Sequence, residues 1–182
     1  MFNALDFIEY EFNPQEIKSK INLKTNNWVT NELTNCYAFA LGLDLKPSEI
    51  CRYADAHLYC GGRFFLLLNH LLNDDGTLEK MSYQEKFELD FQSLELFYEE
   101  IELYDKIVDA NEWKIAYFEN EKEKGFHFYR QAENGIWYHK PGFYFEKPTC
   151  YTEKKFLIND PIQGALVDYP DYTYKRTYRL RK

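Results

Sequence analysis

The sequence predicts an α+β fold in which a short cysteine-bearing helix packs on an antiparallel β-sheet. Three observations favour this class: a small apolar run that starts at Cys36, helical periodicity between residues 47 and 108, and alternating patterns after residue 111 that are typical of strands. The chain has 182 residues, of which 45% are hydrophobic, so it can fill one core. We therefore expect a single domain over residues 1–182, with a helical insertion at about 47–108.

The first predicted element carries Cys36. The polar segment before it predicts an irregular lead-in with at most one short helix. Thr34 is a candidate N-cap, and the apolar run from Cys36 to Leu41 stops near Gly42. This pattern predicts a short buried helix with Cys36 in its first turn.

The insertion is predicted to hold two helices. Apolar residues between Phe64 and Leu72 form one helical face, which ends at an Asp-Asp-Gly turn. A second amphipathic helix is expected from apolar residues that recur every three or four positions between Phe87 and Tyr104. Its interleaved carboxylates are typical of a solvated helix face.

Strands are predicted after the insertion. The segments 113–117 and 126–131 alternate and flank a charged turn, which predicts a hairpin. An Asn-Gly turn then leads to a third strand at 136–139.

The C-terminal tail is expected to add one or two more strands, at 156–158 and 172–180. Five basic residues between Lys175 and Lys182 alternate with tyrosine and leucine, which predicts an edge strand whose outward charges block pairing. An anionic partner is the alternative interpretation of these charges.

Composition excludes several classes of partner. The chain has 22 Lys and Arg against 30 Asp and Glu, a formal charge of -8, and this argues against nucleic acid and anionic membranes, which bind positive surfaces. Four cysteines without a Cys-x-x-Cys pair predict neither a zinc ribbon nor a disulfide scaffold, and we expect no metal and no other cofactor. The oligomeric state is left open.

Localisation is predicted from what the sequence lacks. No apolar stretch reaches the ~18 to 20 residues of a membrane span, and the N-terminus shows no basic leader followed by an apolar region. We expect a soluble, cytoplasmic protein, or one exported without a classical signal peptide as an effector or phage protein.

Cys36 is the residue best placed for covalent chemistry. Cysteine reacts as a thiolate, and the N-terminus of a helix favours negative charge, so a lowered pKa is expected for Cys36. The alternative is that Cys36 is a small apolar core residue. Cys51, Cys60 and Cys150 lack this helix context.

Two of the four histidines, His127 and His139, lie twelve positions apart on neighbouring predicted strands. A thiol–imidazole pair needs a rigidly held histidine, and a third group must fix the orientation and tautomer of its ring. We therefore expect His127 to act as the base and His139 to orient it by accepting a ring N–H. His57 and His70 have no comparable context.

This Cys–His–His order resembles the NlpC/P60-type, papain-like cysteine peptidases. The resemblance rests on Asn35-Cys36-Tyr37-Ala38 at a helix start, on His127 in a strand, and on Trp137-Tyr138-His139 in the next strand. It implies a papain-like fold with Cys36 as nucleophile, His127 as general base and acid, and His139 as the orienting residue. The implied activity is a hydrolase or transferase acting on an amide or isopeptide bond of a peptide or protein substrate, as a peptidase, amidase or deamidase.

Several site assignments remain open at the sequence level. Asn31 and Asn35 are candidates for an oxyanion hole beside the Cys36 N–H, and the alternative for Asn35 is a helix N-cap. Asp160 is the rival orienting residue, because papain-like enzymes often use Asn or Asp there, and its alternative is an Asp-Pro turn.

A second hypothesis for the whole chain is a catalytically inactive papain-like fold that serves as a protein-interaction module. Its acidic helix face and 16 tyrosines would supply the binding surface.

Overall fold

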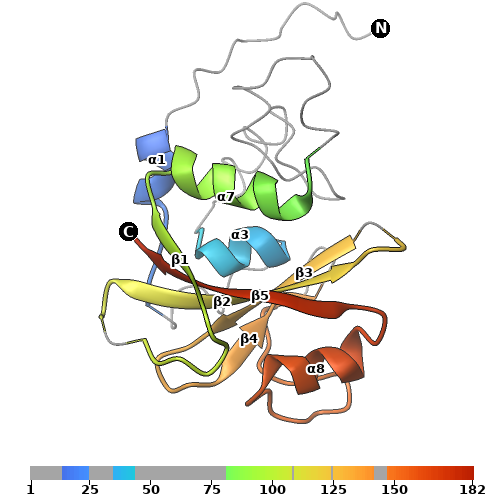
Figure 1. The fold of residues 1–182 in the computed structure, drawn as a ribbon. Helices are drawn as coiled ribbons and strands as arrows, with labels where there is room; N and C mark the ends of the chain where they lie inside the picture. Colours follow the sequence, from blue (N-terminus) through green and yellow to red (C-terminus); the bar gives the residue numbers. More distant parts are fainter. Residues whose placement is uncertain (1–13, 25–34, 44–80, 108, 124, 142–146) are drawn as a thin grey trace, which may run out of the picture.

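A computed structural model describes residues 14–24, 35–43, 81–107, 109–123, 125–141 and 147–182. Within these ranges, short helices pack on a five-stranded antiparallel sheet, which confirms the predicted α+β class (Figure 1). No helix in these ranges is long and apolar enough to cross a membrane.

The sheet has the strand order β1-β5-β2-β3-β4, and all neighbouring strands are antiparallel. The described strands are β1 (Phe97–Ile101), β2 (Glu112–Asn120), β3 (Gly125–Gln131), β4 (Trp137–His139) and β5 (Thr173–Arg181). The described helices are α1 (Pro14–Ser19), α3 (Cys36–Leu41), α7 (Tyr83–Ser93) and α8 (Pro161–Asp168).

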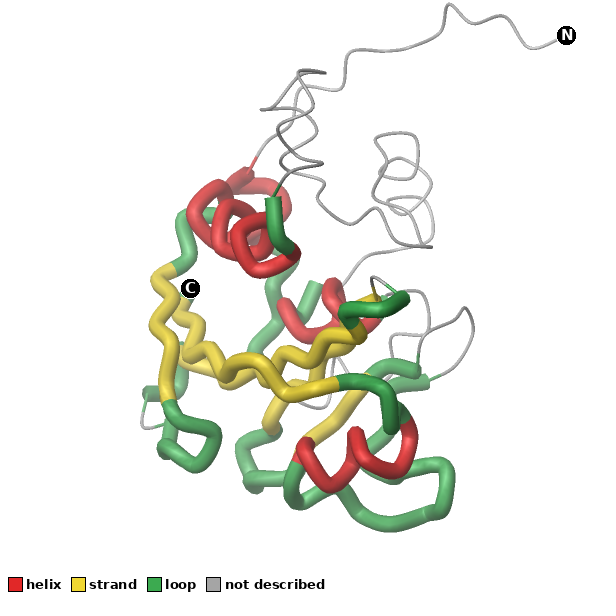
Figure 2. Tube along the Cα trace, turned by 45° about the vertical axis from the view of Figure 1, so that its right-hand side comes forward, coloured by secondary structure: helices red, strands yellow, loops and turns green. Residues whose placement is uncertain are grey.

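Helices cover both faces of the sheet. In Figures 1 and 2, α3 and α7 lie on one side and α8 lies on the other. Successive strand residues point to opposite faces, so β2 and β3 supply two cores. Tyr117 and Phe128 pack in the core under α3 and α7, whereas Phe118 and Tyr129 pack in the core beside α8.

The predicted hairpin is present as β2 and β3, and the predicted third strand is present as β4. The predicted helix at Cys36–Leu41 is also present, and it ends at Gly42. The helix predicted at 64–72 falls outside the described residues.

The helix predicted from Phe87 to Tyr104 was wrong in its second half. Helix α7 ends at Ser93, Glu95 adopts a left-handed φ of 53°, and the chain continues as strand β1. The carboxylates of β1 face basic side chains of β5, and the ion pairs are Glu99–Arg179 and Glu100–Arg176. Pairing with a distant strand therefore overrides a helical spacing pattern.

The position predicted for the basic tail was also wrong. Strand β5 is not an edge strand, because it lies between β1 and β2. Its basic side chains pair with acidic residues of the described chain, including Lys175 with Glu121. The strand predicted at 156–158 is reduced to an isolated bridge between Tyr151 and Leu157.

Candidate functional site

Helix α3 is fixed at both ends by its own sequence. The N-cap is Asn35 rather than Thr34, and its side-chain oxygen accepts a hydrogen bond from the Ala38 N–H at 2.8 Å. At the other end Gly42 adopts a φ of 75°, a conformation that suits glycine. These caps make Cys36 the first residue of the helix.

The Cys36 thiol lies against the backbone of strand β3. Strand β4 pairs with residues 129–131 of β3, and among the described residues no strand pairs with the backbone before Tyr129 on that side. Sγ of Cys36 lies 4.0 Å from the carbonyl oxygen of Phe126, and the Phe128 backbone also interacts with the thiol. Cys36 therefore contacts the backbone on both sides of His127.

Burial dominates the electrostatics of Cys36. The residue is 7% exposed, and desolvation raises the pKa of its thiol to about 12. Backbone hydrogen bonds and the charge of Lys140 lower this pKa, but their effect is smaller. The expected lowering by the helix N-terminus is thus outweighed, and the resting thiol is neutral. Cys36 and Cys150 are both free cysteines.

The structure brings the two predicted histidines together. Nε2 of His127 and Nδ1 of His139 lie 3.0 Å apart, and both residues are 2% exposed. Burial lowers the pKa of His127 well below its usual value, with a further contribution from His139, and burial lowers that of His139 to about 4. Both rings are therefore neutral near pH 7, so one nitrogen of the pair donates and the other accepts.

Aromatic rings and the end of helix α8 enclose this histidine pair. Tyr169, the C-cap of α8, stacks on the His127 ring at a centroid distance of 4.1 Å, and Tyr129 stacks on His139 at 5.0 Å. Asp168, the last residue of α8, places Oδ2 3.7 Å from Nε2 of His139. Sequence reasoning missed both α8 and Asp168.

A sequence signal for α8 did exist. Asp160 accepts a hydrogen bond from the Ile162 N–H and is followed by Pro161, and this is the N-cap and first-turn proline pattern that starts a helix. Asp160 is therefore the N-cap of α8, and its other oxygen accepts from the Tyr104 hydroxyl. In the described chain it makes no hydrogen bond to either histidine.

The pairing of Cys36 with His127 stays a prediction. In the described part of the chain the two side chains share no hydrogen bond: Cys36 packs in the core under α3 and α7, whereas His127 points to the α8 face of the sheet, where its ring contacts Tyr129 and Tyr169. Asn31 lies outside the described residues. The side-chain oxygen of Asn35 is used as the N-cap. Within the Asn35 side chain, the amide N–H groups therefore remain to bind an oxyanion.

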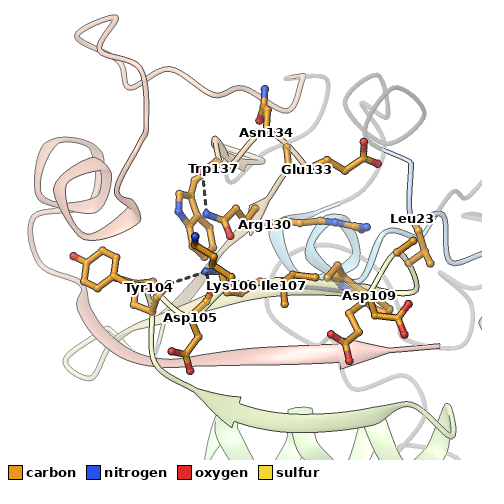
Figure 3. A pocket seen from close by; sticks show the side chains of 18 of the residues that line it. Leu23, Tyr104, Asp105, Lys106, Ile107, Asp109, Arg130, Glu133, Asn134 and Trp137 are labelled. Carbon is orange, nitrogen blue, oxygen red and sulfur yellow. Dashed lines mark hydrogen bonds between the residues drawn. The ribbon is translucent and has the colours of Figure 1, made fainter.

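A separate cavity of about 650 Å³ lies at the other end of β3 and β4 (Figure 3). In its wall, Nζ of Lys114 donates to the backbone carbonyls of Leu103 and Asp105 and lies over the Trp137 ring. None of the three predicted catalytic residues lines this cavity. Among the described residues, no cluster of His, Cys, Asp and Glu is arranged to hold a metal ion.

Comparison with known proteins gives no relative for this chain. No family model matches it, and neither a curated protein nor a solved structure shows significant similarity to it.

Proposed function

We propose that this protein is a cysteine-dependent hydrolase or transferase that acts on an amide or isopeptide bond, with a divergent papain-like arrangement. Cys36 is the nucleophile, His127 the general base and acid, and His139 the residue that orients His127. The observation that carries the proposal is the 3.0 Å contact between His127 Nε2 and His139 Nδ1. It uses one nitrogen of His127 for orientation and leaves Nδ1 to exchange a proton.

The reaction follows from these roles. Cys36 packs on the α3 face and His127 points to the α8 face, so the reaction requires the two side chains to meet at the edge of β3. Nδ1 of His127 then takes the proton from the Cys36 thiol while Sγ forms a bond to the substrate carbonyl carbon. His127 then gives this proton to the leaving amine as the C–N bond breaks, which leaves a thioester on Cys36. Water or an acceptor amine attacks the thioester and loses its proton to His127, which returns it to Sγ of Cys36 as the C–S bond breaks and the acyl product leaves.

The neutral state of the site determines when the proton moves. Because burial disfavours both a thiolate at Cys36 and an imidazolium at His127, the resting pair is neutral. Proton transfer therefore accompanies attack on the substrate, and the oxyanion forms beside the Cys36 backbone N–H.

The test compares alkylation of Cys36 by iodoacetamide in the wild type and in His127→Ala, measured residue by residue with mass spectrometry. Burial gives the thiol a pKa of about 12 in both proteins, against a usual 9.0, so its thiolate is scarce in both, and only a base that removes the proton during attack can speed the wild-type reaction. We expect wild-type Cys36 to react at least about tenfold faster than Cys36 in the variant.

Cys150 is the internal control, because it is a free cysteine in the same chain and lies outside the histidine pair. Its rate should be the same in both proteins. His127→Asn is a second variant in case alanine destabilises the fold, and circular dichroism checks that each variant is folded. Equal and slow labelling of Cys36 in all three proteins would refute the proposal.

One observation favours a second candidate, the non-catalytic interaction module. Cys36 is 7% exposed and carries a strongly raised pKa, and these are properties of a core cysteine. The same labelling experiment separates the candidates, since an interaction module predicts no dependence on His127.

A further inference from the structure

We propose that Asp168 is a positioning residue that fixes the tautomers of both buried histidines. It accepts a hydrogen bond from Nε2–H of His139, and this leaves Nδ1 of His139 to accept from Nε2–H of His127. The catalytic role of Asp168 rests on the proposed function, but the tautomers of His127 and His139 can be measured without any activity.

Two buried polar atoms that face each other carry the inference. Nε2 of His139 and Oδ2 of Asp168 are both buried, make no side-chain hydrogen bond in the described chain, and lie 3.7 Å apart. The backbone of Tyr151 also interacts with the His139 ring and raises its pKa, so it is a second acceptor for the His139 proton. Both side chains are only 3% exposed. A buried polar group without a partner costs about 1–3 kcal/mol, so a small approach of these two atoms satisfies both at once.

The backbone of Glu153, in the loop before α8, holds the carboxylate in this position. The other oxygen of Asp168, Oδ1, accepts a hydrogen bond from the Glu153 N–H at 2.9 Å, so Oδ2 is the oxygen that faces His139. The next residue, Tyr169, stacks on His127. One helix end therefore contacts both histidines.

The direction of the proton arrangement follows from chemistry. An ionised carboxylate can only accept, so the nitrogen that faces it must carry the proton. With Nε2 of His139 protonated, its Nδ1 is an acceptor and Nε2 of His127 must donate. Nδ1 of His127 is then the unprotonated nitrogen, the form that a general base toward Cys36 requires. Without Asp168 the direction of the hydrogen bond between the two histidines can reverse. Nδ1 of His127 would then be protonated and unable to accept a proton.

Tyr129 is the competing partner. Its hydroxyl is also buried without a hydrogen bond in the described chain. Burial raises its pKa most, and Tyr169 and then Asp168 add smaller contributions, so the hydroxyl lies within electrostatic range of the carboxylate. Tyr129→Phe removes this hydroxyl and keeps the ring that stacks on His139. It is the matched control for a variant of Asp168.

The experiment uses full-length protein labelled with ¹⁵N-histidine and records two-bond ¹H–¹⁵N correlations near neutral pH. In the wild type, both His127 and His139 are expected as the Nε2–H tautomer. Asp168→Ala should shift at least one of them toward Nδ1–H, whereas Asp168→Asn, which keeps an acceptor oxygen, and Tyr129→Phe should both retain the wild-type tautomers.

Three results would overturn the assignment: an Nδ1–H tautomer of His139 in the wild type, unchanged tautomers in Asp168→Ala, or a change in Tyr129→Phe equal to that in Asp168→Ala. The wild-type spectrum alone is a test if the alanine variant does not fold.

Iodoacetamide labelling of Cys36 in the same variants separates this inference from the proposed function. We expect Asp168→Ala to lower the labelling rate toward that of His127→Ala. If the tautomers change in Asp168→Ala but the labelling rate of Cys36 does not depend on His127, the proposed enzymatic function is refuted and the positioning role of Asp168 is retained. Labelling that depends on His127 but not on Asp168, with unchanged tautomers, refutes the role of Asp168 alone.

Discussion

Replacement of Asp90 by asparagine should stabilise the protein increasingly as the pH rises. Asp90 lies on α7 at 1% exposure, and its Oδ2 accepts a hydrogen bond from the hydroxyl of Tyr37, the residue after Cys36. Its Oδ1 is buried without a hydrogen-bond partner in the described chain. Burial raises the pKa of Asp90 well above 3.8, and the Tyr37 bond only partly offsets this.

The sign and slope of the effect follow from proton linkage. The unfolded chain releases the Asp90 proton near its ordinary pKa of about 3.9, whereas the folded protein retains it to higher pH. The folded state therefore binds more protons in this window, and the free energy of unfolding falls by about 1.4 kcal/mol per pH unit as the pH rises from about 3.9 to the folded pKa. Asparagine has no proton to lose, and its amide oxygen still accepts from Tyr37.

The assay is urea unfolding of wild type and Asp90→Asn between about pH 4 and about pH 7, followed by circular dichroism. The difference in free energy of unfolding should grow in favour of the variant with a slope approaching 1.4 kcal/mol per unit. Glu123→Gln, at an exposed position, is the control for the exchange of a carboxylate for an amide. A difference for Asp90→Asn that stays constant within about 0.5 kcal/mol across this range would refute the reasoning.

Three further substitutions test the local structure through urea unfolding. Gly42→Ala should destabilise by more than the ~1–2 kcal/mol of a left-handed residue, because its Cβ would lie 2.6 Å from the backbone oxygen of Asn22 as well as 2.1 Å from Nη1 of Arg130; a smaller loss would contradict the close approach. Asn35→Ala should cost about 0.5–2 kcal/mol through loss of the cap to Ala38, while Asn35→Asp keeps the cap and the stability; a Cys36-dependent activity lost in both variants would assign the amide N–H to the oxyanion, and one retained in Asn35→Ala would exclude it. Phe87→Ala should cost about 3–5 kcal/mol, because the ring is 0% exposed and packs edge-on against several aromatic rings; a loss under about 1.5 kcal/mol would mean that this core collapses around the cavity.

The parts of the fold that the sequence predicts are those set by short-range rules. An Asn-Gly turn between alternating segments is enough to predict the β3–β4 pair, and Gly42 is enough to predict the end of α3. The same rules bring His127 and His139 onto adjacent strands, and the structure places their nitrogens 3.0 Å apart.

The parts that the sequence does not predict depend on distant partners. Strand β1 has the apolar spacing of a helix, and it is a strand because β5, some eighty residues later, pairs with it. Asp168 has no motif of its own, since only the packing of α8 against β4 brings its carboxylate to His139. The lowered pKa expected for Cys36 failed for a related reason, because burial is set by the tertiary core and not by the helix start.

This neutral site predicts a particular pH dependence for the reaction of Cys36. A thiolate–imidazolium pair forms as the cysteine ionises, so its reactivity rises with pH at the lowered pKa of the thiol. Here the base becomes available once His127 loses its proton, and burial places that pKa well below 6.5, so the acidic limb lies below this value. The thiol does not ionise by itself until about pH 12, so the rate should stay flat from about pH 6.5 to about pH 9.

Iodoacetamide labelling of Cys36 across this range checks the profile. His127→Ala is the control, and its labelling rate should rise continuously with pH. A wild-type rate that also rises about tenfold per pH unit throughout would show that the thiol reacts without help from His127.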